Sequence, residues 1–139
     1  MGDYAFDKSV EYCLYNLNSL KELEIGNNWF ESVKTFKIDG LNQLKTIKIG
    51  NNSFTQKKND NGNDKSKSFH ILNCESLESI QIGQYSFSDY GGKFELKNLP
   101  QLQSIQIGTI GRWSYNFISS SLVLRGIELI LNIVMNRSS

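Results

Sequence analysis

The chain repeats one pattern of apolar and polar positions along most of its length. Each copy is apolar at its first, fourth, seventh and ninth positions, and the positions between them are mostly polar. A glycine follows the ninth position in all copies except the last. Such repetition is typical of solenoid proteins, in which each unit buries its apolar faces against its neighbours. The copies begin at Leu17, Leu41, Cys74, Leu99 and Ile127.

A shorter alternating pattern precedes every copy. Large apolar and polar residues alternate over five positions, which is typical of a half-buried strand. The fifth residue is Asn or Gly, and these residues tolerate the positive φ that a turn can require. Each unit is therefore predicted to supply a strand, a corner, a second strand around the I-x-I residues and a return loop. The five copies are 12–16, 36–40, 69–73, 94–98 and 122–126.

Stacking of the units predicts columns of equivalent residues about 4.7–4.9 Å apart. The four apolar positions of the pattern would form four interior columns, the first of which includes Leu17. A further column, four residues after the glycine, consists of Phe30, Phe54 and Phe87 and is expected to fill the far corner. The sequence thus predicts one mainly β domain over 1–139, a solenoid of about five rungs with little or no helix. The units lie near 12–35, 36–68, 69–93, 94–121 and 122–136.

The same motifs carry a family resemblance. Segments 17–28 and 41–52 read L-x-x-L-x-x-L-x-I-x-x-N and L-x-x-L-x-x-I-x-I-x-x-N, and they resemble leucine-rich repeats. The I-G-x-x-S-F step and segment 74–80 resemble the BspA-like (Treponema pallidum type) subclass. The resemblance implies a right-handed solenoid whose I-x-I strands form a parallel sheet on the concave side. It also implies that the side chains of Asn28 and Asn52 form a ladder, and that the chain binds proteins or ligands, often at a cell surface, without catalysis.

The longest departure from the repeat is the insertion 55–68, which reads TQKKNDNGNDKSKS. It is polar and has no apolar anchor, so we expect it to be mobile. It does not fit a calcium loop, because Lys57 and Ser68 stand where the first and twelfth ligands are required to be acidic. A basic docking loop through its lysines is one alternative, and a tolerated insertion is the favoured one. The lysines are Lys57, Lys58, Lys65 and Lys67.

The net charge and the two cysteines indicate which kinds of partner and which cellular location to expect. Lys and Arg total 15 and Asp and Glu total 14, so the net charge of +1 argues against a nucleic-acid or anionic-membrane partner. No apolar stretch is long enough to span a membrane. Cys13 and Cys74 lie two rungs apart, beyond the disulfide reach of about 7 Å, and are predicted to be free thiols. Free thiols and the lack of a signal-peptide pattern favour an intracellular location, whereas the resemblance favours the cell surface.

The candidate binding site is the set of residues that flank the buried positions of the I-x-I strands. An open polar face of a repeat array is where such proteins bind partners, although any solvated sheet face is also polar. His70 occupies an outward strand position with no Ser or Cys nucleophile pattern beside it, so we predict no enzyme, cofactor or metal site. The partner is expected to be a protein. The predicted contact residues are Glu22, Glu24, Thr46, Lys48, Ser79, Gln81, Ser104 and Gln106.

The last rung is a second candidate surface. Leu131, Ile133 and Val134 make it apolar on both faces, and only four residues follow Met135. A terminal strand with unpaired backbone groups is a template for edge pairing. We therefore expect self-association through the C-terminal rung. The alternative function is accordingly a structural segment of a longer array that associates through its terminal rungs.

Overall fold

The computed structural model describes residues 11–55, 64–108, 116–117, 121–125 and 132–135, the last two segments by their backbone alone. These residues form ten short strands and no helix, so none of them belongs to a helix that could cross a membrane. The strands are β1 (Glu11–Tyr15), β2 (Glu22–Ile25), β3 (Thr35–Asp39), β4 (Thr46–Ile49), β5 (Ser68–Leu72), β6 (Ser79–Ile82), β7 (Lys93–Lys97), β8 (Ser104–Ile107), β9 (Ser121–Arg125) and β10 (Asn132–Met135).

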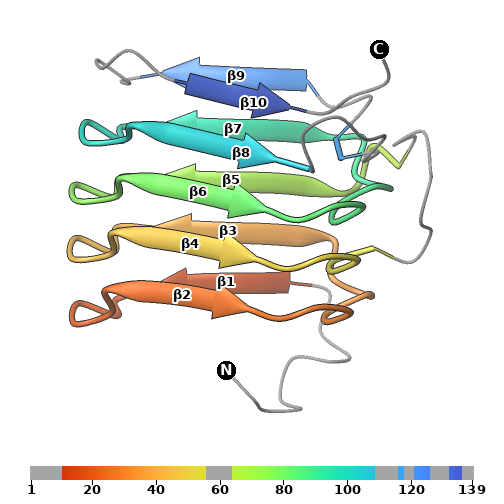
Figure 1. Cartoon of the computed structure of the whole chain (residues 1–139), viewed down its shortest axis with the longest axis horizontal. Coiled ribbons are helices and arrows are strands. Elements are labelled where there is room, and N and C mark those ends of the chain that lie inside the picture. Colours follow the sequence, from red (N-terminus) through yellow and green to blue (C-terminus); the bar gives the residue numbers. More distant parts are fainter. Residues whose placement is uncertain (1–10, 56–63, 109–115, 118–120, 126–131, 136–139) are drawn as a thin grey trace.

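The strands alternate between two five-stranded sheets. Sheet A has the order β1-β3-β5-β7-β9, and sheet B has the order β10-β8-β6-β4-β2. Every pairing is parallel and joins equivalent positions of successive units, as in Ile47 with Ile80. Each rung therefore gives one strand to each sheet, and the rungs stack one above another (Figure 1). The mainly β repeat architecture predicted from the sequence is confirmed.

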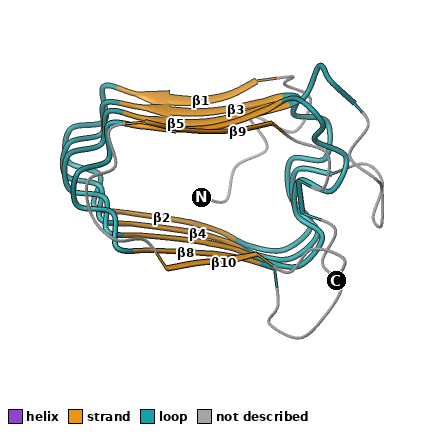
Figure 2. Cartoon of the chain, turned by 90° about the horizontal axis from the view of Figure 1, so that it is seen from above, coloured by secondary structure: helices purple, strands orange, loops and turns teal. Residues whose placement is uncertain are grey.

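The two sheets face each other across a common core (Figure 2). Along each strand, buried and exposed residues alternate, as the period-2 pattern predicts; β2 reads exposed, buried, exposed, buried. The rungs lie almost directly over one another along the axis of the stack. As a result, equivalent side chains form continuous columns.

Aromatic rings fill much of the core. In sheet A the ring of Phe69 stacks between those of Phe36 and Phe94, with centroids 4.8 and 4.9 Å away. At the corner that follows sheet B, Phe87 stacks between Phe54 and Phe117 at 4.8 and 5.0 Å. The two columns meet edge to face, which is a favourable geometry for aromatic pairs. The predicted corner column is confirmed, and Phe117 is a further member of it.

The corner between sheets A and B is built on the predicted turn residues. Asn16, Gly40, Asn73 and Asn98 all have positive φ, between 55° and 73°. The apolar residues that follow them in the second, third and fourth rungs are fully buried. Leu17, however, is 44% exposed, so its predicted interior position is wrong. The equivalent Leu41 and Cys74 each lie between two described corners, whereas Leu17 belongs to the first.

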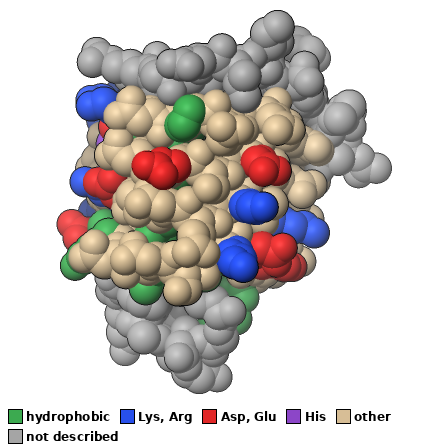
Figure 3. All heavy atoms as spheres, turned by 90° about the vertical axis from the view of Figure 1, so that its left-hand side faces the viewer, with side chains coloured by type: hydrophobic (Ala, Val, Ile, Leu, Met, Phe, Trp, Pro, Cys, Tyr) green, Lys and Arg blue, Asp and Glu red, His purple; other side chains and the backbone are tan. Residues whose placement is uncertain are grey.

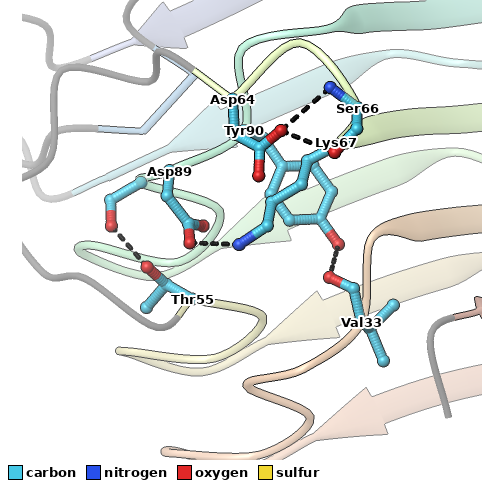
Figure 4. A network of polar contacts seen from close by, with 8 residues as sticks. Val33, Thr55, Asp64, Ser66, Lys67, Asp89 and Tyr90 are labelled. Carbon is cyan, nitrogen blue, oxygen red and sulfur yellow. Dashed lines mark hydrogen bonds and ion pairs between the residues drawn. The ribbon is translucent and has the colours of Figure 1, made fainter.

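The two ends of the insertion are anchored in the fold, which corrects the expectation that all of it is mobile. Lys67 and Asp89 form an ion pair whose side chains are 3% and 6% exposed (Figure 4). Thr55 and Ser88 share a buried hydrogen bond of 2.6 Å between their hydroxyl groups. Since Lys67 is buried, it is not available to a docking loop. Residues 56–63, which include Lys57 and Lys58, lie outside the described residues.

The ion pair belongs to a small polar network around Tyr90. The Tyr90 hydroxyl donates a 2.6 Å hydrogen bond to the Val33 carbonyl, and its ring is fully buried. The N–H groups of Gly91 and Gly92 donate to the carbonyls of Asp64 and Lys67. The insertion therefore returns to the stack through hydrogen bonds and charge, without an apolar anchor.

Both cysteines are free, as predicted. Cys74 is fully buried in the corner column, and burial raises the pKa of its thiol. Cys13 points outward from β1 and is partly exposed; burial, with a smaller effect of the Glu11 carboxylate, raises its pKa. Both thiols therefore favour the protonated, less reactive form.

Candidate functional site

The eight predicted contact residues lie together on the outer face of sheet B. They are the outward positions of β2, β4, β6 and β8, between buried Leu or Ile residues. The parallel register aligns them in two columns across the sheet. One column is Glu22, Thr46, Ser79 and Ser104, and the other is Glu24, Lys48, Gln81 and Gln106.

None of these eight side chains makes a hydrogen bond or ion pair within the described part of the chain. The face is acidic at the first rung, carries Lys48 on the second and is neutral on the third and fourth. The adjoining corner also mixes both signs (Figure 3). It contains an open hollow of about 630 Å³, lined by Lys45, Glu75, Ser76, Glu78, Pro100 and Gln101.

A groove of about 270 Å³ crosses the C-terminal ends of the sheet B strands; we call it the glycine groove. Its floor contains the glycines that follow the strands, together with buried isoleucines. Outward side chains from β4, β6 and β8 precede the glycines, and asparagines follow them. The lining residues are Asn27, Lys48, Ile49, Gly50, Asn51, Gln81, Ile82, Gly83, Gln106 and Gly108.

The groove exists because successive rungs approach too closely for side chains at the glycine positions. A Cβ atom on Gly83 would lie 2.5 Å from the carbonyl carbon of Gly50 and 2.4 Å from Oδ1 of Asn51. A Cβ atom on Gly50 would meet Gly26 and Asn27 in the same way. Glycine is therefore required at these positions by contact with the preceding rung.

Asparagine side chains connect the rungs beside the groove. Oδ1 of Asn27 accepts a hydrogen bond of 2.7 Å from the backbone N–H of Asn51. Oδ1 of Asn51 accepts one of 2.8 Å from the N–H of Gln84. The ladder implied by the family resemblance is thus made one residue earlier than expected. Asn28 and Asn52 instead adopt positive φ, 63° and 59°, which an asparagine tolerates in a turn.

A second polar ladder lies under the same return loops. The Ser53 hydroxyl donates to the Gly26 carbonyl at 2.8 Å, and the Ser86 hydroxyl donates to the Gly50 carbonyl at 2.5 Å. In the next rung the Asn116 amide donates to the Gly83 carbonyl at 2.8 Å. These bonds hold the glycine segments, and with them the floor of the groove, at a fixed spacing.

The structure also brings together a cluster on sheet A that sequence reasoning missed. Nδ1 of His70 lies 2.9 Å from Oε1 of Glu95, and Nε2 of His70 lies 2.9 Å from the Ser68 hydroxyl. The hydrogen bond from His70 lowers the pKa of Glu95. Ser68 precedes His70 by two positions on one strand face, and Glu95 faces His70 on the adjacent strand. The repeat already aligned the segments 69–73 and 94–98, so the cluster could have been predicted from that register.

The Ser68–His70–Glu95 arrangement has the order of a nucleophile, a base and a carboxylate. Acyl transfer also needs N–H groups directed at the developing oxyanion. The N–H of Ser68 is already bound to the Lys34 carbonyl at 2.8 Å, and the residues around it are paired in the sheet. Hydrogen bonds across β5 and β7 hold the three side chains to one another.

No protein-family model, curated protein or solved structure matches the chain. Within the described ranges, no three His, Cys, Asp or Glu side chains gather in a way that could hold a metal ion. The C-terminal rung is placed by its backbone, where β10 pairs with β8 and ends sheet B. Leu131 and the side chains of Ile133 and Val134 lie outside the described residues.

Proposed function

We propose that the chain is a non-enzymatic interaction module that binds a protein partner through the outer face of sheet B. The observation that carries this proposal is the set of outward side chains on sheet B. On sheet A, the outward His70 side chain bonds to those of Glu95 and Ser68. On sheet B, the eight outward side chains have no partner among the described residues, so their hydrogen-bonding groups are available to another molecule.

The shape of this face also favours binding over catalysis. Glu22 and Glu24 could suggest a carboxylate pair, but both are exposed on an open sheet. Acid–base chemistry needs an enclosure that shifts the pKa of such groups. A broad polar face across four rungs instead suits the contact area of a protein interface.

The repeat spacing supports a leucine-rich-repeat solenoid of the BspA-like kind, right-handed and with sheet B on its concave side. The I-x-I strands of this proposal are β2, β4, β6 and β8, which carry the predicted contact residues. An asparagine ladder beside the return loops supports this proposal, although Asn27 and Asn51 make it one position before the asparagines of the motif.

Charge reversal on the outer face of sheet B tests the proposal. The triple variant Glu22→Lys/Glu24→Lys/Lys48→Glu should capture at least about tenfold less partner from an extract of the native source, since like charges placed opposite each other cost several kcal/mol. The matched control is Glu31→Lys/Glu75→Lys/Lys34→Glu, which changes exposed charges of the same kinds outside this face. The readout is a quantitative pull-down with each immobilised variant.

The control variant should retain capture of the same partner. Equal capture by the two triple variants would contradict the proposal. It would favour the second candidate, a structural segment that associates through its terminal rungs. That candidate is motivated by β1, β2, β9 and β10, which end the two sheets in the described part of the chain. In that case sedimentation should show the same self-association for both variants.

A further inference from the structure

The glycine groove presents hydrogen-bond donors. Oδ1 of Asn27 and Oδ1 of Asn51 each accept from a backbone N–H, which can only donate. This contact fixes the orientation of both amides. The Nδ2 amino group is therefore the end of each side chain that remains for a ligand. The two amino groups lie one rung apart, beside the glycine floor.

The other polar residues that line the groove add further hydrogen-bond donors. Lys48 adds a positive charge and three N–H donors, and Gln81 and Gln106 add two amides that can donate or accept. The lining contains no carboxylate, so no acidic group of the groove competes for these donors. A ligand that accepts several hydrogen bonds and carries negative charge complements such a site, because charge-assisted hydrogen bonds are the stronger ones.

The size of the groove restricts the ligand further. Its volume of about 270 Å³ lies below the range of about 300–1,000 Å³ for pockets that hold drug-sized molecules. It can hold one side chain or one small group. The residues that line it include no aromatic ring, so it offers no stacking platform for a sugar. These features favour a side-chain carboxylate over an acidic sugar.

We infer that the glycine groove binds an aspartate or glutamate side chain of the protein partner, with Lys48, Asn51 and Gln81 as the contact residues. This inference rests on the proposed function, because the groove opens on the outer face of sheet B. It deepens that proposal by naming the chemistry of the partner's anchor. The acidic anchor would lie on the Lys48 rung, one rung away from Glu24.

The inference can be tested without the native partner. The probe is acetyl-Glu-Glu-Glu-amide, titrated into ¹⁵N-labelled protein at constant ionic strength, and the readout is the side-chain NH₂ signals of Asn51 and Gln81. We expect these signals to shift saturably, with a dissociation constant of about 1 mM. In Lys48→Met the constant should rise about tenfold. Lys45→Met, which removes the same charge from the same rung but outside the groove, should leave it unchanged.

Two further arms identify the ligand chemistry. Acetyl-Gln-Gln-Gln-amide should produce no saturable shift, and sodium galacturonate should bind more weakly than the glutamate peptide. The inference is overturned if the glutamine peptide shifts the same signals equally, if galacturonate binds more tightly, or if Lys45→Met weakens binding as much as Lys48→Met. Spectra of the free variants that overlay on the parent spectrum would show that each variant is folded.

The groove test and the pull-down can fail separately. If the glutamate peptide binds the groove but the charge-reversed face still captures the partner, the proposed function is wrong and the groove is a carboxylate site of another role. If partner capture depends on the face but the peptide does not bind, the groove inference alone is wrong.

Discussion

Replacing Phe87 with alanine should lower the free energy of unfolding by about 3–5 kcal/mol, the range for a large aromatic residue removed from a packed core. Phe87 is fully buried and stacks between Phe54 and Phe117. It also meets Phe69 edge to face at 5.0 Å and Tyr90 at 4.9 Å. The cavity would therefore interrupt the corner column and remove edge-to-face contacts from the sheet A column. Urea unfolding followed by circular dichroism measures the loss.

The matched control for this prediction is Leu17→Ala. Leu17 has an equally apolar side chain but is 44% exposed, so its removal should cost less than about 0.5 kcal/mol. Similar losses at the two positions would contradict a core built from continuous columns. In that case the repeat would not be stabilised by the stacking of its aromatic rings.

Replacing Lys67 with methionine should cost about 3–5 kcal/mol, because it leaves the buried Asp89 carboxylate without its cation. Replacing both residues, as in Lys67→Met/Asp89→Leu, should be less destabilising than Lys67→Met alone. No uncompensated charge remains buried in the double variant. The free energies of unfolding of the parent, Lys67→Met, Asp89→Leu and the double variant form a double-mutant cycle. This cycle isolates the interaction between the two side chains.

Lys65→Met is the control for the ion pair. Lys65 comes from the same segment but is exposed, so its replacement should change stability by less than about 0.5 kcal/mol. If Lys67→Met were as mild as Lys65→Met, the insertion would not be anchored through its charge. The expectation of a mobile, tolerated insertion would then hold for this end of it as well.

The strands and the interior columns could be predicted from the sequence, because a repeat with period-2 strands encodes directly which side chains face inward. Ile25, Ile49 and Ile82 are buried for this reason, and Lys48 and Gln81 point outward for the same reason. The contact residues of the outer face of sheet B follow from the same alternation. Their placement needed no knowledge of how the rungs are connected.

Features that depend on contacts between units were harder to predict from the sequence. The asparagine ladder is made by Asn27 and Asn51, because a one-residue difference in the turn decides which side chain reaches the next rung. Phe117 follows its glycine at a longer spacing than the other corner phenylalanines, so a fixed offset does not find it. The exposure of Leu17 follows from its place in the first rung, which a repeat pattern does not express.

Polar interactions between distant residues were also not encoded in the pattern. Lys67 and Asp89 are separated by 22 positions and meet only because the insertion returns to the stack. A lysine in a run of polar residues is normally solvated, so its burial depends on a partner that the local sequence does not identify. His70 and Glu95, by contrast, occupy equivalent positions of successive units, and the predicted register already places them side by side.

In the proposed function, the outer face of sheet B is the surface that contacts the partner. Photo-cross-linking tests it most directly, with benzoylphenylalanine placed either at Gln81 on this face or at Lys37 on the outer face of sheet A. We expect the partner captured by the unmodified chain to form an adduct with the Gln81 variant and not with the Lys37 variant. An adduct formed only from position 37, or equally from both positions, would contradict it.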